Sequence, residues 1–131
     1  LPTYYVMEDG KTMPETVAVE MPEEPSKWLT DAELGIYCRE FERTGFQGGL
    51  NWYRARVKGV DSIQRITIRV PTTFIAGKHD WGVFQAPGVF ESMQSTACSD
   101  MRGVHLVDGA GHWVQQEQAE ITSRLLLNFL A

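Results

Sequence analysis

The 131-residue chain has little cysteine, no long hydrophobic run and no basic patch. Two cysteines, Cys38 and Cys98, are too few for a disulfide framework, so we expect a reducing compartment, the cytoplasm. No apolar stretch reaches the roughly 18 residues that a membrane-spanning helix needs, so no span is expected. The net charge of −5, without clustered Lys or Arg, argues against nucleic acid as a partner.

An initiating methionine is also absent, since the chain begins at Leu1. We therefore expect a processed product, a cloned fragment or a truncated record, and an upstream targeting peptide stays open. The amino-acid composition is typical of globular proteins, since hydrophobic residues make up 43% and charged residues 22%. The length suffices for one domain of usual size.

The first 60 residues read as an irregular arm followed by two helices. Residues 1–29 are acidic and carry four helix-breaking prolines, so an extended arm is expected. Thr30 and Glu33 form a capping-box pattern that predicts a helix start, and Gly45 suits its end. A second helix is expected over residues 50–57. The apolar stripe of the first helix comprises Leu34, Tyr37, Cys38 and Phe41.

The second half alternates between strand and helix patterns. Ile63 to Val70 resembles a strand, and a buried strand ending in a Gly loop follows. A strand–helix–strand order requires right-handed crossovers and a parallel sheet, which places the chain in the α/β class. The later elements are expected at residues 72–77 (strand), 88–97 (helix), 104–107 (strand) and about 117–130 (helix).

Asp80 and His112 occupy equivalent places, each just past the end of a predicted parallel strand. That edge of an open α/β sheet is where ligands bind. A carboxylate that accepts a hydrogen bond from one ring nitrogen fixes the tautomer of a histidine and supports its action as a base. Alternatively, Asp80 caps a turn and His112 is structural; the strand order favours the acid–histidine pair. His105, inside a strand, is expected to be structural, and His79 to face solvent.

Three segments carry a specific resemblance. Residues 41–54 (FERTGFQGGLNWYR) resemble the cap-domain signature of soluble epoxide hydrolases, a family of the α/β-hydrolase fold. Residues 74–80 (FIAGKHD) resemble the strand end that carries its acid, and residues 109–117 (GAGHWVQQE) its catalytic-histidine loop. The resemblance covers about residues 30–131. It implies the C-terminal portion of an α/β-hydrolase fold, with a partial cap at residues 1–60 and part of the core domain at 61–131.

The resemblance also implies a reaction. The family hydrolyses epoxides to vicinal diols through a covalent ester, with no metal or organic cofactor, and its members act in detoxification. It implies catalytic roles for Asp80, His112 and Tyr53, whose phenol would donate to the epoxide oxygen. Periodicity alone makes Tyr53 an ordinary core aromatic. The aromatic residues expected to line a pocket for an apolar epoxide, or only to pack, are Trp52, Trp113 and Phe46.

No strand-to-helix elbow with a nucleophilic Asp is identifiable, nor the family's oxyanion segment or its second cap tyrosine. We therefore expect the isolated chain to be inactive and to need an N-terminal half of the same fold, in the same or a separate chain. The exposed parallel edge of two strands favours such pairing. A homodimer stays open. Two alternative hypotheses for the function are another α/β hydrolase, such as a haloalkane dehalogenase or esterase, and a non-catalytic fragment or subunit.

Overall fold

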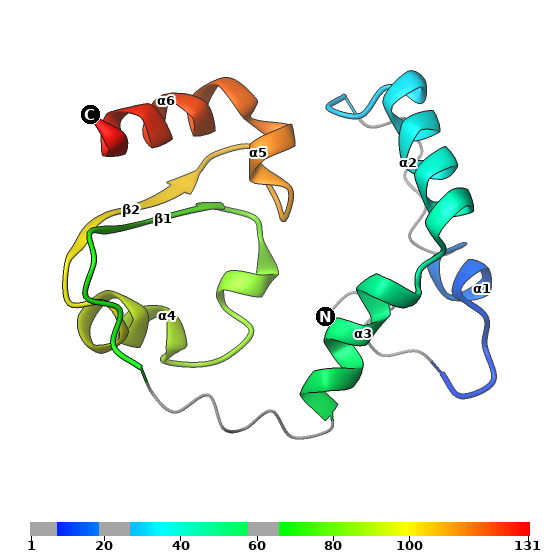
Figure 1. Cartoon of the computed structure of the whole chain (residues 1–131), viewed down its shortest axis with the longest axis horizontal. Helices are drawn as coiled ribbons and strands as arrows, with labels where there is room; N and C mark the ends of the chain where they lie inside the picture. The colour runs from blue at the N-terminus through cyan, green and yellow to red at the C-terminus, as the bar shows by residue number, and fades with distance from the viewer. Residues whose placement is uncertain (1–7, 19–26, 58–65) are drawn as a thin grey trace.

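The computed structural model describes residues 8–18, 27–57 and 66–131 (Figure 1). A two-stranded sheet is covered by short helices, and a separate group of helices comes from the first half of the chain. The elements are α1 (Met13–Val17), α2 (Asp31–Thr44), α3 (Gln47–Val57), β1 (Thr72–Gly77), the 3₁₀ helix η3 (Trp81–Val83), α4 (Val89–Ser92), the π-helix η4 (Met93–Ala97), β2 (Met101–Val107), α5 (Val114–Glu117) and α6 (Ala119–Leu130).

The predicted capping box starts α2. The Thr30 amide donates to the Glu33 carboxylate at 2.8 Å, and the Glu33 amide donates to the Thr30 hydroxyl at 3.3 Å. These bonds satisfy amides that have no partner inside the helix. The helix ends at Thr44, where Gly45 takes a positive φ of 68°. Both predicted boundaries of this helix are confirmed.

The expectation of an irregular arm over residues 1–29 is wrong for residues 13–17, which form α1. Pro14 lies in the first turn, where a missing N–H costs nothing because that amide would have no intrahelical partner. Thr12 and Glu15 add a capping box of their own, with the Thr12 amide 2.8 Å from the Glu15 carboxylate. A proline therefore begins this helix instead of preventing it.

The second predicted helix, α3, begins at Gln47 and not at Leu50 as the periodicity predicted. Gly48 and Gly49 are poor helix formers, yet the structure includes both in the first turn. On α2, the predicted stripe lines a groove of about 400 Å³ with Phe46, but no residue of the helix is buried within the described parts of the chain.

The sheet consists of β1 and β2, paired in parallel as predicted. Thr73 aligns with Gly103 and Gly77 with Val107, so the carboxyl ends of both strands meet at one edge. The second strand begins at Met101, three residues before the predicted start. Figure 1 shows α6 on one side of the two strands and α4 on the other.

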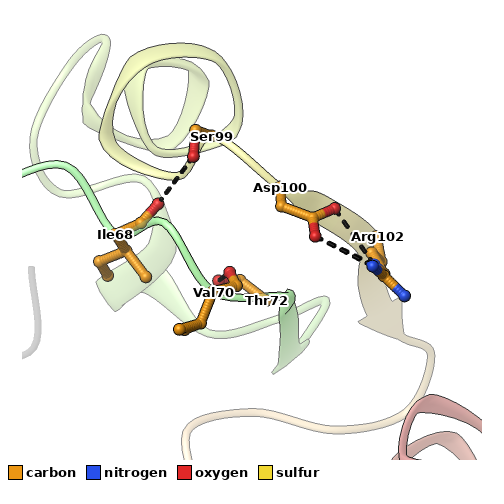
Figure 2. A network of polar contacts seen from close by, with 6 residues as sticks. All are labelled: Ile68, Val70, Thr72, Ser99, Asp100 and Arg102. Atoms are coloured by element: carbon orange, nitrogen blue, oxygen red, sulfur yellow. Dashed lines mark hydrogen bonds and ion pairs between the residues drawn. The ribbon is translucent and has the colours of Figure 1, made fainter.

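The expected strand over residues 63–70 is not formed in its described part. Ile68 makes only an isolated parallel bridge with Cys98, while Ile63 lies outside the described residues. The Ser99 hydroxyl donates to the Ile68 carbonyl at 3.3 Å, and Arg102 pairs with Asp100 at 3.0 Å (Figure 2). These bonds fix the start of the sheet, at the end opposite to the carboxyl edge. Thr72 also donates to the carbonyl of Val70 at 2.9 Å (Figure 2).

The crossover between the strands is helical, as predicted for residues 88–97. Gly88 takes a φ of 77° and precedes α4, which continues directly into the π-helix η4. Phe90 and Met93 are half-buried. The ring of Phe90 meets that of Phe74 on β1 edge-on at 5.8 Å, which packs the crossover against one face of the sheet.

The other face holds the small buried core. Val107, Ala110 and Val114 are buried, and half-buried Ile75, Ile121 and Leu125 pack against them. The predicted final helix begins at Ala119 and not at about Glu117, because Gln118 has non-helical dihedral angles (φ −135°, ψ 56°) that separate α5 from α6. Within the part of the chain that the structure describes, no helix is long and apolar enough to cross a membrane.

Candidate active site

Asp80 follows β1 at the carboxyl edge of the sheet, and its residue surface is 9% exposed. One carboxylate oxygen, Oδ1, accepts a hydrogen bond from the Gly82 amide at 2.8 Å and caps η3. The turn-capping alternative is therefore correct for this oxygen. It leaves the second oxygen, Oδ2, free to bind another group.

That group is His112, which follows β2 at the same edge. Its Nδ1 lies 3.1 Å from Oδ2 of Asp80, so the predicted contact is present. The His112 side chain is 57% exposed, whereas that of Asp80 is 11% exposed. With the proton on Nδ1 shared with the carboxylate, Nε2 is the nitrogen left to accept a proton. The arrangement is that of a histidine base with a carboxylate partner.

The loop that carries His112 lies directly against the loop that carries Asp80. A Cβ on Gly77 would lie 2.1 Å from the carbonyl oxygen of Gly111, so only glycine permits this approach. The amide of His79 donates to the Ala110 carbonyl at 3.0 Å. The loops after the two strands are therefore held together by direct contacts between their backbones.

A surface ion pair joins the same loops. The Lys78 ammonium donates to the Asp108 carboxylate at 2.7 Å. This hydrogen bond, and then the positive charge of Lys78, lower the pKa of Asp108 below its ordinary value. Both side chains are largely exposed, so the pair contributes little stability.

Glu117, at the end of α5, contacts the His112 loop from the other side. One carboxylate oxygen accepts from the Gly111 amide at 2.7 Å and the other from the Trp113 amide at 2.9 Å. The sequence predicted no role for Glu117 beyond its place in the histidine-loop motif. The spacing in the sequence could have predicted this contact. A glutamate one helical turn after Trp113 can accept hydrogen bonds from backbone amides that have no partner inside the helix.

Trp113 stands beside His112, with the two rings edge-on at 5.2 Å. Trp113 also lines a pocket of about 190 Å³ between α2 and the histidine loop. The Tyr37 hydroxyl accepts a hydrogen bond from Gln116 across this boundary. Besides Trp113, the residues that line the pocket are Trp28, Leu29, Leu34, Tyr37 and Gln116.

The other sequence-predicted site residues are not brought to this pair. Tyr53 and Trp52 are exposed on α3, which Figure 1 places apart from the sheet. The Tyr53 hydroxyl has no hydrogen-bond partner among the described residues. Phe46 stacks on Phe41 at 4.5 Å in the α2 groove. Only Trp113, among the aromatic residues expected at the pocket, lies beside His112.

The remaining histidines lie as expected. His79 is exposed in the loop after β1, and His105 is half-buried within β2. Across residues 8–18, 27–57 and 66–131, no group of three or more His, Cys, Asp or Glu side chains is placed to hold a metal ion.

Known proteins provide the context for this geometry. No protein-family model matches the chain. Epoxide hydrolase B of Mycobacterium tuberculosis is 37% identical over 112 residues, which cover 83% of this chain and 31% of that protein. The crystal structure of epoxide hydrolase A from Mycobacterium thermoresistibile superposes with a TM-score of 0.68 at 39% identity. It covers 83% of this chain and 34% of the other.

The structure of potato (Solanum tuberosum) epoxide hydrolase I superposes with a TM-score of 0.72 at 30% identity. It covers 95% of this chain and 40% of the potato chain. The chain belongs to the epoxide hydrolase family. Its strands and helices correspond to a C-terminal portion of the α/β-hydrolase fold, as the sequence predicted.

The chain spans about a third of the length of the curated epoxide hydrolases that it matches. Within this segment the structure brings Asp80 and His112 into contact at the carboxyl edge of the sheet.

Proposed function

We propose that the complete gene product containing these residues hydrolyses epoxides to vicinal diols through a covalent ester. The observation that carries the proposal is the 3.1 Å contact between Asp80 and His112 at the carboxyl edge of adjacent parallel strands. It occurs in a chain whose relatives are named epoxide hydrolases. The mechanism assigns a separate task to each group.

In the first step, a carboxylate outside these 131 residues attacks one epoxide carbon. The carbon–oxygen bond breaks, an ester forms, and the epoxide oxygen takes a proton from a hydroxyl donor. Tyr53 is the proposed donor. Its phenol hydroxyl can donate a hydrogen bond to the developing alkoxide and so support it. Its exposure on α3 leaves the hydroxyl free to meet a substrate.

In the second step, Nε2 of His112 removes a proton from water, and the resulting hydroxide attacks the ester carbonyl. The ester bond breaks, the diol leaves, and the carboxylate is restored. The proton that His112 took from water returns through solvent to the tyrosine that gave one up in the first step. Asp80 holds the ring and stabilises the imidazolium that forms, since its Oδ2 already faces Nδ1. A positioned base of this kind accelerates hydrolysis by about 10²- to 10⁴-fold.

The substrate is proposed to be a small apolar epoxide. Trp113 offers an apolar surface beside His112, and Trp52 and Phe46 are exposed aromatic residues of the cap. We assign residues 1–60 to a partial cap and residues 61–131 to the core domain. Each described strand has a single neighbour in the sheet, so β1 offers its other edge to an N-terminal part of the fold.

The proposal is tested by assaying diol formation from an aryl epoxide with the complete gene product. We expect turnover by the wild type, and loss of about 10²- to 10⁴-fold in His112→Gln and Asp80→Asn. The matched control is His79→Gln, since His79 is exposed in the same pair of loops. Turnover of a haloalkane or a simple ester, and not of an epoxide, would overturn the assignment. So would equal loss in all three variants.

A further inference from the structure

We infer that Glu117 is a positioning residue that fixes the backbone on both sides of His112 and thereby aims its ring at the water attacking the ester. The inference rests on the proposed function and deepens it. Its basis is the pair of hydrogen bonds from the Gly111 and Trp113 amides to the two oxygens of one carboxylate, at 2.7 and 2.9 Å.

Packing alone does not hold the His112 side chain, because it is 57% exposed. A second fixed point is therefore needed beside the contact with Asp80. A catalytic ring must stay within about 0.5 Å and 10–20° of its working geometry. Glu117 binds the residues before and after His112, so rotation of the His112 backbone would break at least one of these two bonds.

A carboxylate is the group that this site requires. Both partners are N–H donors, and an ionised carboxylate offers an acceptor to each; such charge-assisted bonds are about twice as strong as neutral ones. A glutamine would turn its own NH₂ toward one of the two amides. Gln118 adds a weaker contact, since its amide nitrogen lies 3.4 Å from the Gly109 carbonyl. The bend between α5 and α6 at Gln118 leaves both side chains at the loop.

The proposed mechanism gives this role a kinetic signature. His112 acts only when water attacks the ester, whereas the epoxide is opened by a different carboxylate. Misplacing His112 should therefore slow hydrolysis of the ester and leave its formation unchanged. A purely structural role for Glu117 would instead lower the folded fraction and reduce both steps together.

The test uses the complete gene product with Glu117→Gln and Glu117→Asp. Glu120→Gln is the matched control, because Glu120 is 92% exposed and has only a 3.8 Å contact with Arg124. Rapid mixing with an aryl epoxide, followed by mass spectrometry, measures ester formation and decay separately. We expect Glu117→Gln to form the ester at the wild-type rate and to hydrolyse it about tenfold to a hundredfold more slowly. Glu117→Asp should show a smaller loss, and Glu120→Gln none.

Unchanged ester decay in folded Glu117→Gln, with normal turnover by the wild type, would overturn the inference and leave the proposed function intact. Absence of any ester in the wild type would instead refute the proposed function. If Glu117→Gln does not fold, Glu117→Asp decides. Slower decay with normal formation supports positioning, and equal loss in both steps contradicts it.

Discussion

The Cα atom of Gly77 packs so closely on the Gly111 carbonyl that a methyl group there would lie 2.1 Å from its oxygen. The carbonyl of Ala110 would also be only 2.3 Å away. Both obstacles are backbone atoms and cannot swing aside. The two loops that carry Asp80 and His112 therefore depend on a residue without a side chain at position 77.

Gly77→Ala should push the histidine loop away from the Asp80 loop. We expect a loss of about 1–3 kcal/mol in the free energy of unfolding, with a fall in epoxide turnover. Gly49→Ala is the matched control, because a Cβ there meets nothing within 4 Å and alanine favours the helix by up to about 1 kcal/mol. Urea denaturation of both variants gives the comparison. If Gly77→Ala were as stable and as active as the wild type, the close approach of the two loops would not require glycine at position 77.

Local sequence signals predicted the parts of the fold that depend on neighbouring residues. The Thr30–Glu33 capping box and Gly45 marked both ends of α2, because caps act within one helical turn. The alternation of strand and helix predicted the parallel sheet and placed Asp80 and His112 at one edge.

Features that depend on distant partners were missed. The bend at Gln118 accompanies the contacts that Gln118 and Glu117 make with the histidine loop. Periodicity carries no sign of such contacts. The pattern around Ile68 predicted a strand, but Ile68 makes one isolated bridge. A strand forms only where several successive residues pair with a neighbouring strand. The catalytic role of Tyr53 came only from a motif and stays a prediction; within the described residues its hydroxyl forms no hydrogen bond.

Tyr53→Phe should slow ring opening without unfolding α3, because the ring is kept and only the hydroxyl is lost. One well-placed donor contributes about 3 kcal/mol or less to the transition state. Pre-steady-state measurement of ester formation in the complete protein tests this. Tyr37→Phe is the control from α2, where the hydroxyl accepts a hydrogen bond from Gln116 instead. If ester formed at the wild-type rate in Tyr53→Phe, the tyrosine would be reassigned to packing.

Glu33 makes the start of α2 sensitive to pH. The hydrogen bond from the Thr30 backbone amide, and then that from its hydroxyl, lower the pKa of the Glu33 carboxyl below its ordinary value. A lowered pKa means stabilisation that is present above the ordinary glutamate value and lost as pH falls through the folded-state pKa. Thr30→Ala should raise the pKa of Glu33 and cost about 1 kcal/mol. NMR titration of the carboxyl carbon checks this; an unchanged pKa would contradict the capping geometry.

Large apolar side chains remain uncovered on the described residues. Trp52, Ile66 and Leu130 are each more than 70% exposed. Apolar surface left in water forfeits about 25 cal/mol per Å² of stabilisation, against a usual net stability of about 5–15 kcal/mol. Purified alone, these 131 residues should therefore melt broadly, bind a hydrophobic dye or self-associate, and show no epoxide turnover.

Adding the N-terminal two thirds of a related epoxide hydrolase, which this chain does not cover, as a separate chain should sharpen the melting transition and reduce dye binding. Size-exclusion chromatography, calorimetry and an aryl epoxide assay test both statements. If the isolated chain were a monomer that melts cooperatively and turns over epoxide, its exposed apolar side chains would not need an N-terminal part of the fold to bury them.

The central claim is that His112, held by Asp80, acts on the ester and not on the epoxide. The most direct measurement is mass spectrometry of the complete His112→Gln protein after incubation with an aryl epoxide. We expect a stable adduct heavier than the protein by the mass of one epoxide, because ester formation continues while hydrolysis stops. Full diol production with no accumulated adduct would contradict it and remove His112 from the mechanism.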